Sequence, residues 1–227
     1  MIEIKLRQVH ERIAHACAQA GRTPQAVQLL AVSKTFGADA VVQAHAAGQT
    51  AFGENYIQEG VDKICQLAHL PLQWHCIGPI QSNKTRLVAE HFDWVHTIDR
   101  LKIAQRLSEQ RPPTLAPLQV CIQVNVDGGS SKSGVAPADA LELARSVAAL
   151  PNVRLRGVMS IPEPAIDFIA ACAVFAGVRA VFDALNAEGL ELDTLSMGMS
   201  ADMEAAIHEG STMVRVGTAI FGGRAKV

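Results

Sequence analysis

Hydrophobic and polar positions along the chain follow two alternating patterns. Short runs rich in β-branched and other apolar residues predict strands, and longer stretches with apolar residues at helical spacing predict helices between them. The predicted strands are 29–35, 51–55, 73–80, 94–99, 120–127, 155–162, 194–199 and 213–222. The predicted helices are 39–48, 54–69, 81–91, 100–109, 137–149, 166–188 and 200–210, with an additional helix at 2–20 before the first strand.

This repetition of strand and helix predicts an α/β fold with a parallel sheet. Successive strands start roughly 20 to 40 residues apart, the length of one strand-helix unit. Eight units favour a single (β/α)8 TIM-type barrel with an extra N-terminal helix. The alternative, a doubly wound sheet, would favour a G-x-G-x-x-G loop after an early strand, and the sequence has none. We therefore expect residues 1–227 to form one barrel domain, with the prolines near residue 115 in a connection within it.

Composition narrows the class of protein. The 227 residues carry a net charge of −2, so no basic excess suggests nucleic acid as a partner. The apolar run 168–178 is too short for a membrane span and is expected to be a core helix. The first 20 residues have helical spacing and no signal-peptide apolar block, which predicts a cytoplasmic location.

The sequence suggests neither a disulfide framework nor a metal site. Its five cysteines are odd in number and scattered, and no Cys-x-x-Cys or His-Glu-x-x-His occurs. His75 and Cys76 would point to opposite faces of a strand. The stretch 128-GGSSKSG-134 resembles a phosphate-binding Walker loop but lacks the glycine before its lysine, so it is interpreted as a loop.

Lys34 stands out because it ends an otherwise apolar strand. Side chains alternate along a strand, so Lys34 shares a face with Leu30 and Val32. If these two face the barrel interior, the lysine reaches the carboxyl end of the barrel, where TIM barrels carry their chemistry. One interpretation is a lysine that extends to the rim or pairs with a core acid. The other is an amine nucleophile, because burial lowers a lysine pKa and a neutral amine condenses with aldehydes.

The last two strands supply a candidate phosphate site. Ser200 stands where the helix 201–210 should begin, so its hydroxyl and the first amides could hold an anion, although it could equally be only an N-cap. Gly217 would allow close approach of an oxygen, and Thr218 adds a hydroxyl. Barrel phosphate sites are often built from the loops after strands seven and eight. Asp202 would have to point away from such a phosphate.

Arg215 belongs to the same region because it shares a strand face with Gly217. The alternative is a buried ion pair, for example with Asp99. A lysine on the first strand, an arginine on the last and a phosphate site between the last loops fit a phosphorylated aromatic aldehyde. Pyridoxal 5′-phosphate (PLP) is the natural candidate.

Several segments resemble the PLP homeostasis proteins, the YggS/PROSC-like group related to the alanine-racemase-fold barrel. They are 31-AVSKT-35, 53-GENYIQE-59, 74-WHCIGPIQSNK-84, 123-QVN-125, 132-KSG-134, 155-LRGVMSI-161, 196-SMGMSADMEAAI-207 and 214-VRVGTAIFG-222. The resemblance runs from about residue 4 to 224. It departs at Phe36-Gly37, where these proteins often have Lys-Pro, and at the end of the chain, which lacks the usual aromatic residue.

The resemblance implies a role for each candidate residue. Lys34 would form the internal aldimine with PLP, Arg215 would face the pyridine nitrogen, and Ser200, Gly217 and Thr218 would hold the phosphate. Asn55 and His75 would lie near the cofactor without an assigned role. The alternative is that Asn55 is only a turn or cap residue and His75 only a hydrogen-bonded core histidine. Lys132 is a possible secondary PLP-binding lysine or a solvated loop residue.

The expected function is intracellular PLP (vitamin B6) homeostasis by a non-catalytic carrier. A guanidinium about 4 Å from the ring nitrogen contributes roughly 4 kcal/mol against its protonation, which makes the ring a weaker electron sink. The alternative is a PLP-dependent amino-acid racemase, which needs an acid-base group on each face of the substrate, whereas Lys34 serves one. A scaffold with an empty barrel mouth would leave Lys34 and Arg215 without a use. We expect a monomer whose partners are PLP and apo-forms of PLP enzymes, with no nucleic acid or membrane.

Overall fold

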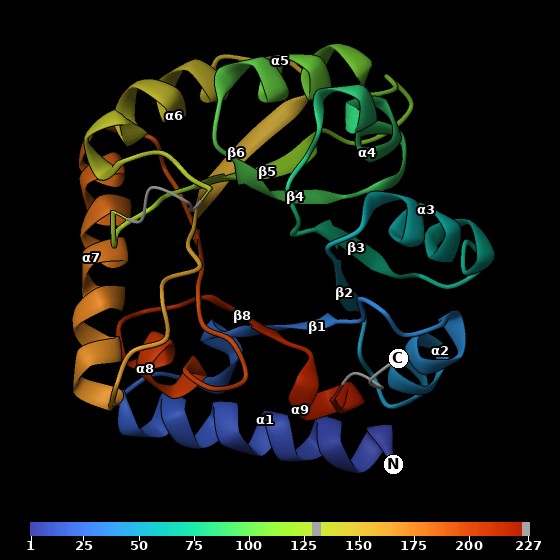
Figure 1. The fold of residues 1–227 in the computed structure, drawn as a ribbon, viewed down its shortest axis with the longest axis vertical. Coiled ribbons are helices and arrows are strands. Elements are labelled where there is room, and N and C mark those ends of the chain that lie inside the picture. Colours follow the sequence, from blue (N-terminus) through green and yellow to red (C-terminus); the bar gives the residue numbers. More distant parts are fainter. Residues whose placement is uncertain (129–132, 224–227) are drawn as a thin grey trace.

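The computed structural model describes residues 1–128 and 133–223. Eight parallel strands close into a barrel in which each strand pairs with its neighbours in sequence and β8 pairs with β1 (Figure 1). The strands are β1 Gln28–Val32, β2 Ala51–Glu54, β3 Gln73–Cys76, β4 Trp94–Ile98, β5 Leu118–Gln123, β6 Val153–Met159, β7 Thr194–Ser196 and β8 Met213–Val216. The predicted (β/α)8 TIM-type barrel with an extra N-terminal helix is confirmed.

The helices lie outside the strands, as a parallel barrel requires. They are α1 Ile2–Gln19, α2 Ala38–Ala46, α3 Ile57–Gln66, α4 Thr85–His91, α5 Leu101–Gln110, α6 Ala140–Ala148, α7 Phe168–Ala187, α8 Met203–His208 and α9 Thr218–Phe221. The extra helix α1 lies across α8 and α9 (Figure 1). It buries Leu6, Val9, Ile13 and Cys17, which recur at the spacing of one helical face.

Alternation along the strands separates the barrel interior from the shell around it. On β1, Leu30 and Val32 join a small cluster with Ile77 and Met213, whereas Leu29 and Ala31 belong to the larger core that includes the helices. A period of two therefore places alternate residues of one strand in two different apolar environments. The same alternation carries the next residue of the inner face, Lys34, to the barrel mouth.

The predicted strands were too long at their carboxyl ends, since the first ends at Val32 rather than residue 35 and the seventh at Ser196 rather than residue 199. Two further boundaries near the carboxyl terminus were also wrong. The predicted strand 213–222 ends at Val216, because the chain turns at Gly217 and continues as the short helix α9. The predicted helix 200–210 begins only at Met203, where Asp202 precedes it. Ser200 is therefore not the N-cap of this helix. At Gly217 the apolar run continues across the turn, so hydrophobicity alone does not reveal that boundary.

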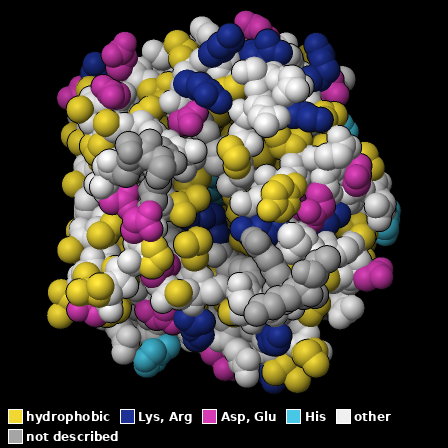
Figure 2. Space-filling view, viewed as in Figure 1, with side chains coloured by type: hydrophobic (Ala, Val, Ile, Leu, Met, Phe, Trp, Pro, Cys, Tyr) yellow, Lys and Arg dark blue, Asp and Glu magenta, His cyan; other side chains and the backbone are white. Residues whose placement is uncertain are grey.

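Helix α7 lies within the predicted helix 166–188, but it is more exposed than the core helix expected there. An 18-residue stretch of this helix has a mean hydropathy of 1.9, so the helix is long and apolar enough to cross a membrane, and 28% of that stretch is buried. Figure 2 shows hydrophobic side chains along the edge of the molecule that α7 forms. The buried residues Ala171, Phe175, Val178, Phe182 and Leu185 share one face, as expected for an outer helix of a barrel.

Candidate functional site

A cavity of about 510 Å³ opens at the carboxyl ends of the strands. This volume lies within the usual range for small-molecule sites, about 300–1,000 Å³. Its apolar wall includes Val32, Ile77, Ile161 and Met199. Six of the seven candidate residues line it, namely Lys34, Asn55, Ser200, Arg215, Gly217 and Thr218. The structure thus brings together residues from both ends of the chain.

Lys34 stands two residues beyond the last residue of β1 and is half-buried. Val32 precedes it on the inner face of the barrel and lines the same cavity, so the predicted inward position of Lys34 is confirmed. The backbone changes direction immediately after the lysine, because Thr35 has a φ of 69°. A left-handed conformation is uncommon for a β-branched residue and requires support from its surroundings.

Arg215 is 4% exposed and crosses the barrel interior from β8. Its guanidinium donates to the Ser196 hydroxyl at 2.8 Å and to the Ser160 carbonyl at 2.9 Å. Burial lowers the pKa of Arg215 to about 10, and Asp202 opposes this shift. The ion pair with Asp99 considered above does not form, since Asp99 lies beside Arg100. Arg215 therefore presents a buried cation whose two hydrogen-bond acceptors are both neutral.

His75 lies deeper in the barrel than the cavity and does not line it. Its Nδ1 is 2.9 Å from Nε2 of His96, and Nδ1 of His96 is 2.8 Å from the Ser196 hydroxyl. Burial lowers the pKa of His75 to about 3 and that of His96 well below its usual value, so both rings are neutral near pH 7. These residues form a hydrogen-bonded chain below Arg215, with Ser196 as the link.

The loops after β7 and β8 form the other end of the cavity. Gly198 turns the chain after β7 with a φ of 96°, and Ser200 follows it. Gly217 precedes α9, and a Cβ there would lie 3.0 Å from the Val32 carbonyl oxygen. This close packing against β1 favours glycine at position 217, independently of any ligand that approaches there. Thr218 begins α9, whose first amides have no partner within the helix.

Asp202 does not line the cavity, although it is near enough to Arg215 to oppose the fall in the pKa of that guanidinium. Its carboxylate accepts a hydrogen bond from the Met199 amide at 2.6 Å. The side chain of Asn55, unlike that of Asp202, lacks a donor among the described residues. Its Oδ1 is buried and has no hydrogen-bond partner in that part of the chain. A buried acceptor without a partner is costly. Asn55 lines the cavity, so a donor on a ligand could satisfy it.

Sequence reasoning missed several polar residues behind the cavity. They are Arg12, Glu54, Lys63, His96, Ser160 and Ser196. The polar residues inside apolar strands were a usable signal: Glu54 ends 51-AFGE-54, and His96 stands in the middle of 94-WVHTI-98. Both are fully buried, and a buried polar residue in a strand calls for a partner.

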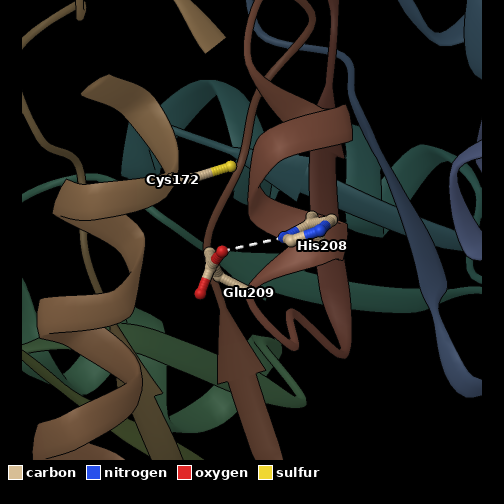
Figure 3. Close-up of side chains that lie close together, drawn as sticks. All are labelled: Cys172, His208 and Glu209. Atoms are coloured by element: carbon tan, nitrogen blue, oxygen red, sulfur yellow. Dashed lines mark hydrogen bonds and ion pairs between the residues drawn. The ribbon is translucent and has the colours of Figure 1, made fainter. Parts of the chain in front are cut away.

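A separate group of possible metal ligands lies on the α7–α8 face. Cys172, His208 and Glu209 place their ligand atoms within 4.8 Å of one another, and Figure 3 shows the Glu209 carboxylate turned toward His208. A hydrogen bond joins His208 Nδ1 and Glu209 Oε1 at 2.8 Å. Burial and then the charge and hydrogen bonding of Glu209 raise the pKa of the Cys172 thiol. Hydrogen bonding to one carboxylate is thus sufficient to explain why the three groups converge.

Known proteins resemble this chain over nearly its whole length. Residues 4–225 match the alanine racemase N-terminal domain family. The chain is 62% identical over 219 residues to the pyridoxal phosphate homeostasis protein of Pseudomonas aeruginosa, covering 96% of this chain and 94% of that relative. The solved structure of PipY from Synechococcus elongatus PCC7942 with PLP bound is 39% identical with a TM-score of 0.81, covering 92% of this chain and 100% of PipY.

A more distant likeness concerns the fold alone. Alanine racemase from Corynebacterium glutamicum is 19% identical to this chain with a TM-score of 0.67. The match covers 95% of this chain and 62% of that structure. At this identity the likeness supports a shared barrel architecture and carries no statement about activity.

Proposed function

This chain belongs to the pyridoxal phosphate homeostasis protein family, and we propose that it binds PLP and takes part in intracellular PLP homeostasis. The observation that carries the proposal is the composition of one cavity. It combines the half-buried amine of Lys34, the hydroxyls of Ser200 and Thr218, and the buried cation of Arg215. Family members with this barrel include PipY, whose structure contains PLP.

The residues of the cavity fit PLP group by group. Lys34 would hold the cofactor covalently at one end, while Ser200, Thr218 and the first amides of α9 would bind its phosphate at the other. Asn55 supplies a buried acceptor that still needs a donor. When bound, the cofactor supplies an aldehyde that condenses reversibly with a neutral amine and releases water.

Arg215 would control the protonation of a bound pyridine ring. Its cation opposes protonation of a nearby ring nitrogen, and its two protein partners are neutral, so they do not cancel its charge. His75 and His96 are neutral as well and supply no acid to this region. An unprotonated pyridine is a weak electron sink, which favours storage of the cofactor over carbanion chemistry.

We further propose that the chain is a PLP carrier that does not catalyse a reaction of its own. Racemisation needs an acid-base group on each face of a substrate. Among the described residues that line the cavity, Lys34 supplies one such group, and no histidine, cysteine, tyrosine or carboxylate joins it. Tyr56, the one tyrosine of the chain, is 51% exposed and lies outside this lining. The racemase remains the alternative because Lys34 supplies one of the two acid-base groups that racemisation needs.

Transfer of the cofactor is tested with a cofactor-free transaminase. Wild-type protein loaded with PLP is incubated with the apo-transaminase, and separately with single amino-acid enantiomers, with Lys34→Ala as control. We expect activation of the transaminase and no interconversion of enantiomers. Interconversion that depends on Lys34 would establish the racemase instead, whereas failure to activate the transaminase would leave sequestration alone.

The remaining parts of the proposal concern the setting of this activity. We propose that residues 1–227 act as one PLP-binding domain, monomeric and cytoplasmic, with apo-forms of PLP enzymes as partners. Lys132, the possible secondary PLP-binding lysine, lies outside the described residues.

A further inference from the structure

Lys63 of α3 forms a buried charged cluster directly behind the Lys34 loop. Its side chain is 5% exposed, and its ammonium donates to Glu54 Oε1 at 2.8 Å, to Glu59 Oε1 at 2.6 Å and to the Ser33 carbonyl at 2.8 Å. An ammonium has three N–H donors, so every donor of Lys63 is used. The cation is therefore fixed in direction as well as in place.

The two carboxylates of this cluster also bind the residues on either side of Lys34. The Ser33 hydroxyl donates to Glu54 Oε1 at 2.6 Å, and the Thr35 amide donates to Glu59 Oε1 at 2.7 Å. The Ser33 amide is held separately by the Gly53 carbonyl of β2 at 3.1 Å. Thr35 has the left-handed φ of 69° that turns the chain after the lysine. The cluster therefore fixes the backbone immediately before and after Lys34.

We propose that Lys63, with Glu54 and Glu59, is a positioning residue that aims the Lys34 amine at the cofactor aldehyde. The proposal rests on the proposed function and deepens it. It assigns these three residues to the covalent step, whereas Ser200 and Thr218 serve the phosphate. None of the three lines the cavity, so they act through Ser33 and Thr35.

The chemistry of the cluster supports a geometric role over a stabilising one. A buried ion pair is often no more stabilising than apolar residues of the same volume, because both charges lose their hydration. Glu54 shows that loss directly, since burial raises its pKa against the opposing effect of Lys63, and its Oε2 has no partner among the described residues. Such a cluster instead supplies directional bonds, and these converge on the Lys34 backbone.

The test compares two ligands that differ at the aldehyde. PLP can react with Lys34, whereas 4′-deoxypyridoxine 5′-phosphate keeps the ring and the phosphate but cannot form the covalent bond. The variant Lys63→Met/Glu54→Gln removes both buried charges with little change in shape. Displacing a reacting group by about 1 Å can slow its reaction by roughly 100-fold. We therefore expect covalent attachment to slow by about tenfold or more and PLP affinity to fall, with affinity for the analogue changed by less than about twofold.

Controls keep failure of this proposal separate from failure of the proposed function. Glu59→Met removes the acceptor of the Thr35 amide at a partly exposed position and should reproduce the selective effect if the double variant does not fold. Arg145→Met, which breaks the distant exposed pair with Glu188, should leave the affinity for both ligands and the rate of covalent attachment unchanged. Equal losses for PLP and the analogue, or no loss for either in a folded variant, would overturn the positioning role. Absence of covalent attachment in the wild type would instead overturn the proposed function.

Discussion

The two ends of the cavity are held by ion pairs of the same chemistry in different environments. Behind Lys34, the side chains of Lys63 and Glu54 are 5% and 0% exposed. Behind Ser200, those of Arg12 and Glu204 are 39% and 34% exposed. In both cases the cation also donates to a backbone carbonyl of the loop, Lys63 to Ser33 at 2.8 Å and Arg12 to Ser200 at 3.0 Å.

This difference in exposure separates two uses of an ion pair. Solvent screens the Arg12–Glu204 pair, so it contributes on the order of 0–1 kcal/mol and can break and reform. Removing one partner of a buried pair leaves the other charge without compensation, which costs about 3–5 kcal/mol. The Lys34 end is therefore expected to be rigid, as a covalent step requires, while the phosphate end can adjust.

Breaking the buried pair should have the largest effect on stability. Lys63→Met alone leaves Glu54 buried without its cation and should lower the free energy of unfolding by about 3–5 kcal/mol. Urea unfolding of the apo-protein measures the change. Adding Glu54→Gln to the same variant should restore most of the loss, because both charges are then gone. A double variant no more stable than the single one would contradict this account of the pair.

The buried histidines below Arg215 are uncharged, unlike the two ion pairs, and should make stability depend on pH. His75 has a pKa of about 3 in the folded state, below its value of about 6.5 in the unfolded chain, so the unfolded state binds more protons between these values. Stability contributed by neutral His75 is therefore present above about pH 6.5 and lost as pH falls toward 3. His75→Gln should reduce the slope of stability against pH in this window by up to about 1.4 kcal/mol per pH unit. An unchanged slope in acid-urea unfolding would show that His75 does not titrate this way.

The phosphate end is tested by removing its hydroxyls. Ser200→Ala/Thr218→Ala should weaken PLP by about 1.5–3 kcal/mol for each charge-assisted hydrogen bond lost, without full additivity. Unphosphorylated pyridoxal should be affected much less, since it offers no dianion to these groups. Fluorescence titration with both ligands measures the two affinities. Equal weakening of both would place the phosphate elsewhere.

The smallest effect is expected from the exposed pair at the same end. Arg12→Met should lower stability by less than about 1 kcal/mol and weaken PLP and its aldehyde-free analogue equally, because it acts on Ser200 rather than on Lys34. Most of the electrostatic part should disappear in 1 M salt, where the screening length is about 3 Å. Titrations at low and high salt check this. A loss confined to PLP would remove the distinction between the two ends.

Short apolar runs were enough to predict that eight strands exist, and period-two alternation was enough to predict the inward direction of Lys34, because side chains on one face repeat every second residue. Pairings between distant residues could not be obtained in this way. Arg12 reaches Ser200 across 188 positions of the sequence, and Lys63 reaches Ser33 from α3, which packs against β2 and β3. These contacts depend on how the helices are placed around the barrel, which a local pattern does not encode.

The residues predicted near the cofactor show the same limit. Asn55 follows the end of β2 and lines the cavity, whereas His75 points into the barrel and stacks on Trp94 with the rings 5.2 Å apart. Membership of a shared motif did not distinguish a residue at the barrel mouth from one below it. The boundary at Gly217 was hidden for a related reason, since α9 continues the apolar run of β8.

We propose that Lys34 is the residue that holds PLP covalently. Borohydride reduction of the PLP-loaded wild-type protein, followed by peptide mapping, identifies the modified lysine directly. We expect the pyridoxyl label predominantly on Lys34. In the Lys34→Ala variant, which keeps the phosphate-binding residues, the corresponding peptide should carry no label. Predominant labelling of another lysine in the wild type, Lys132 included, would contradict the account.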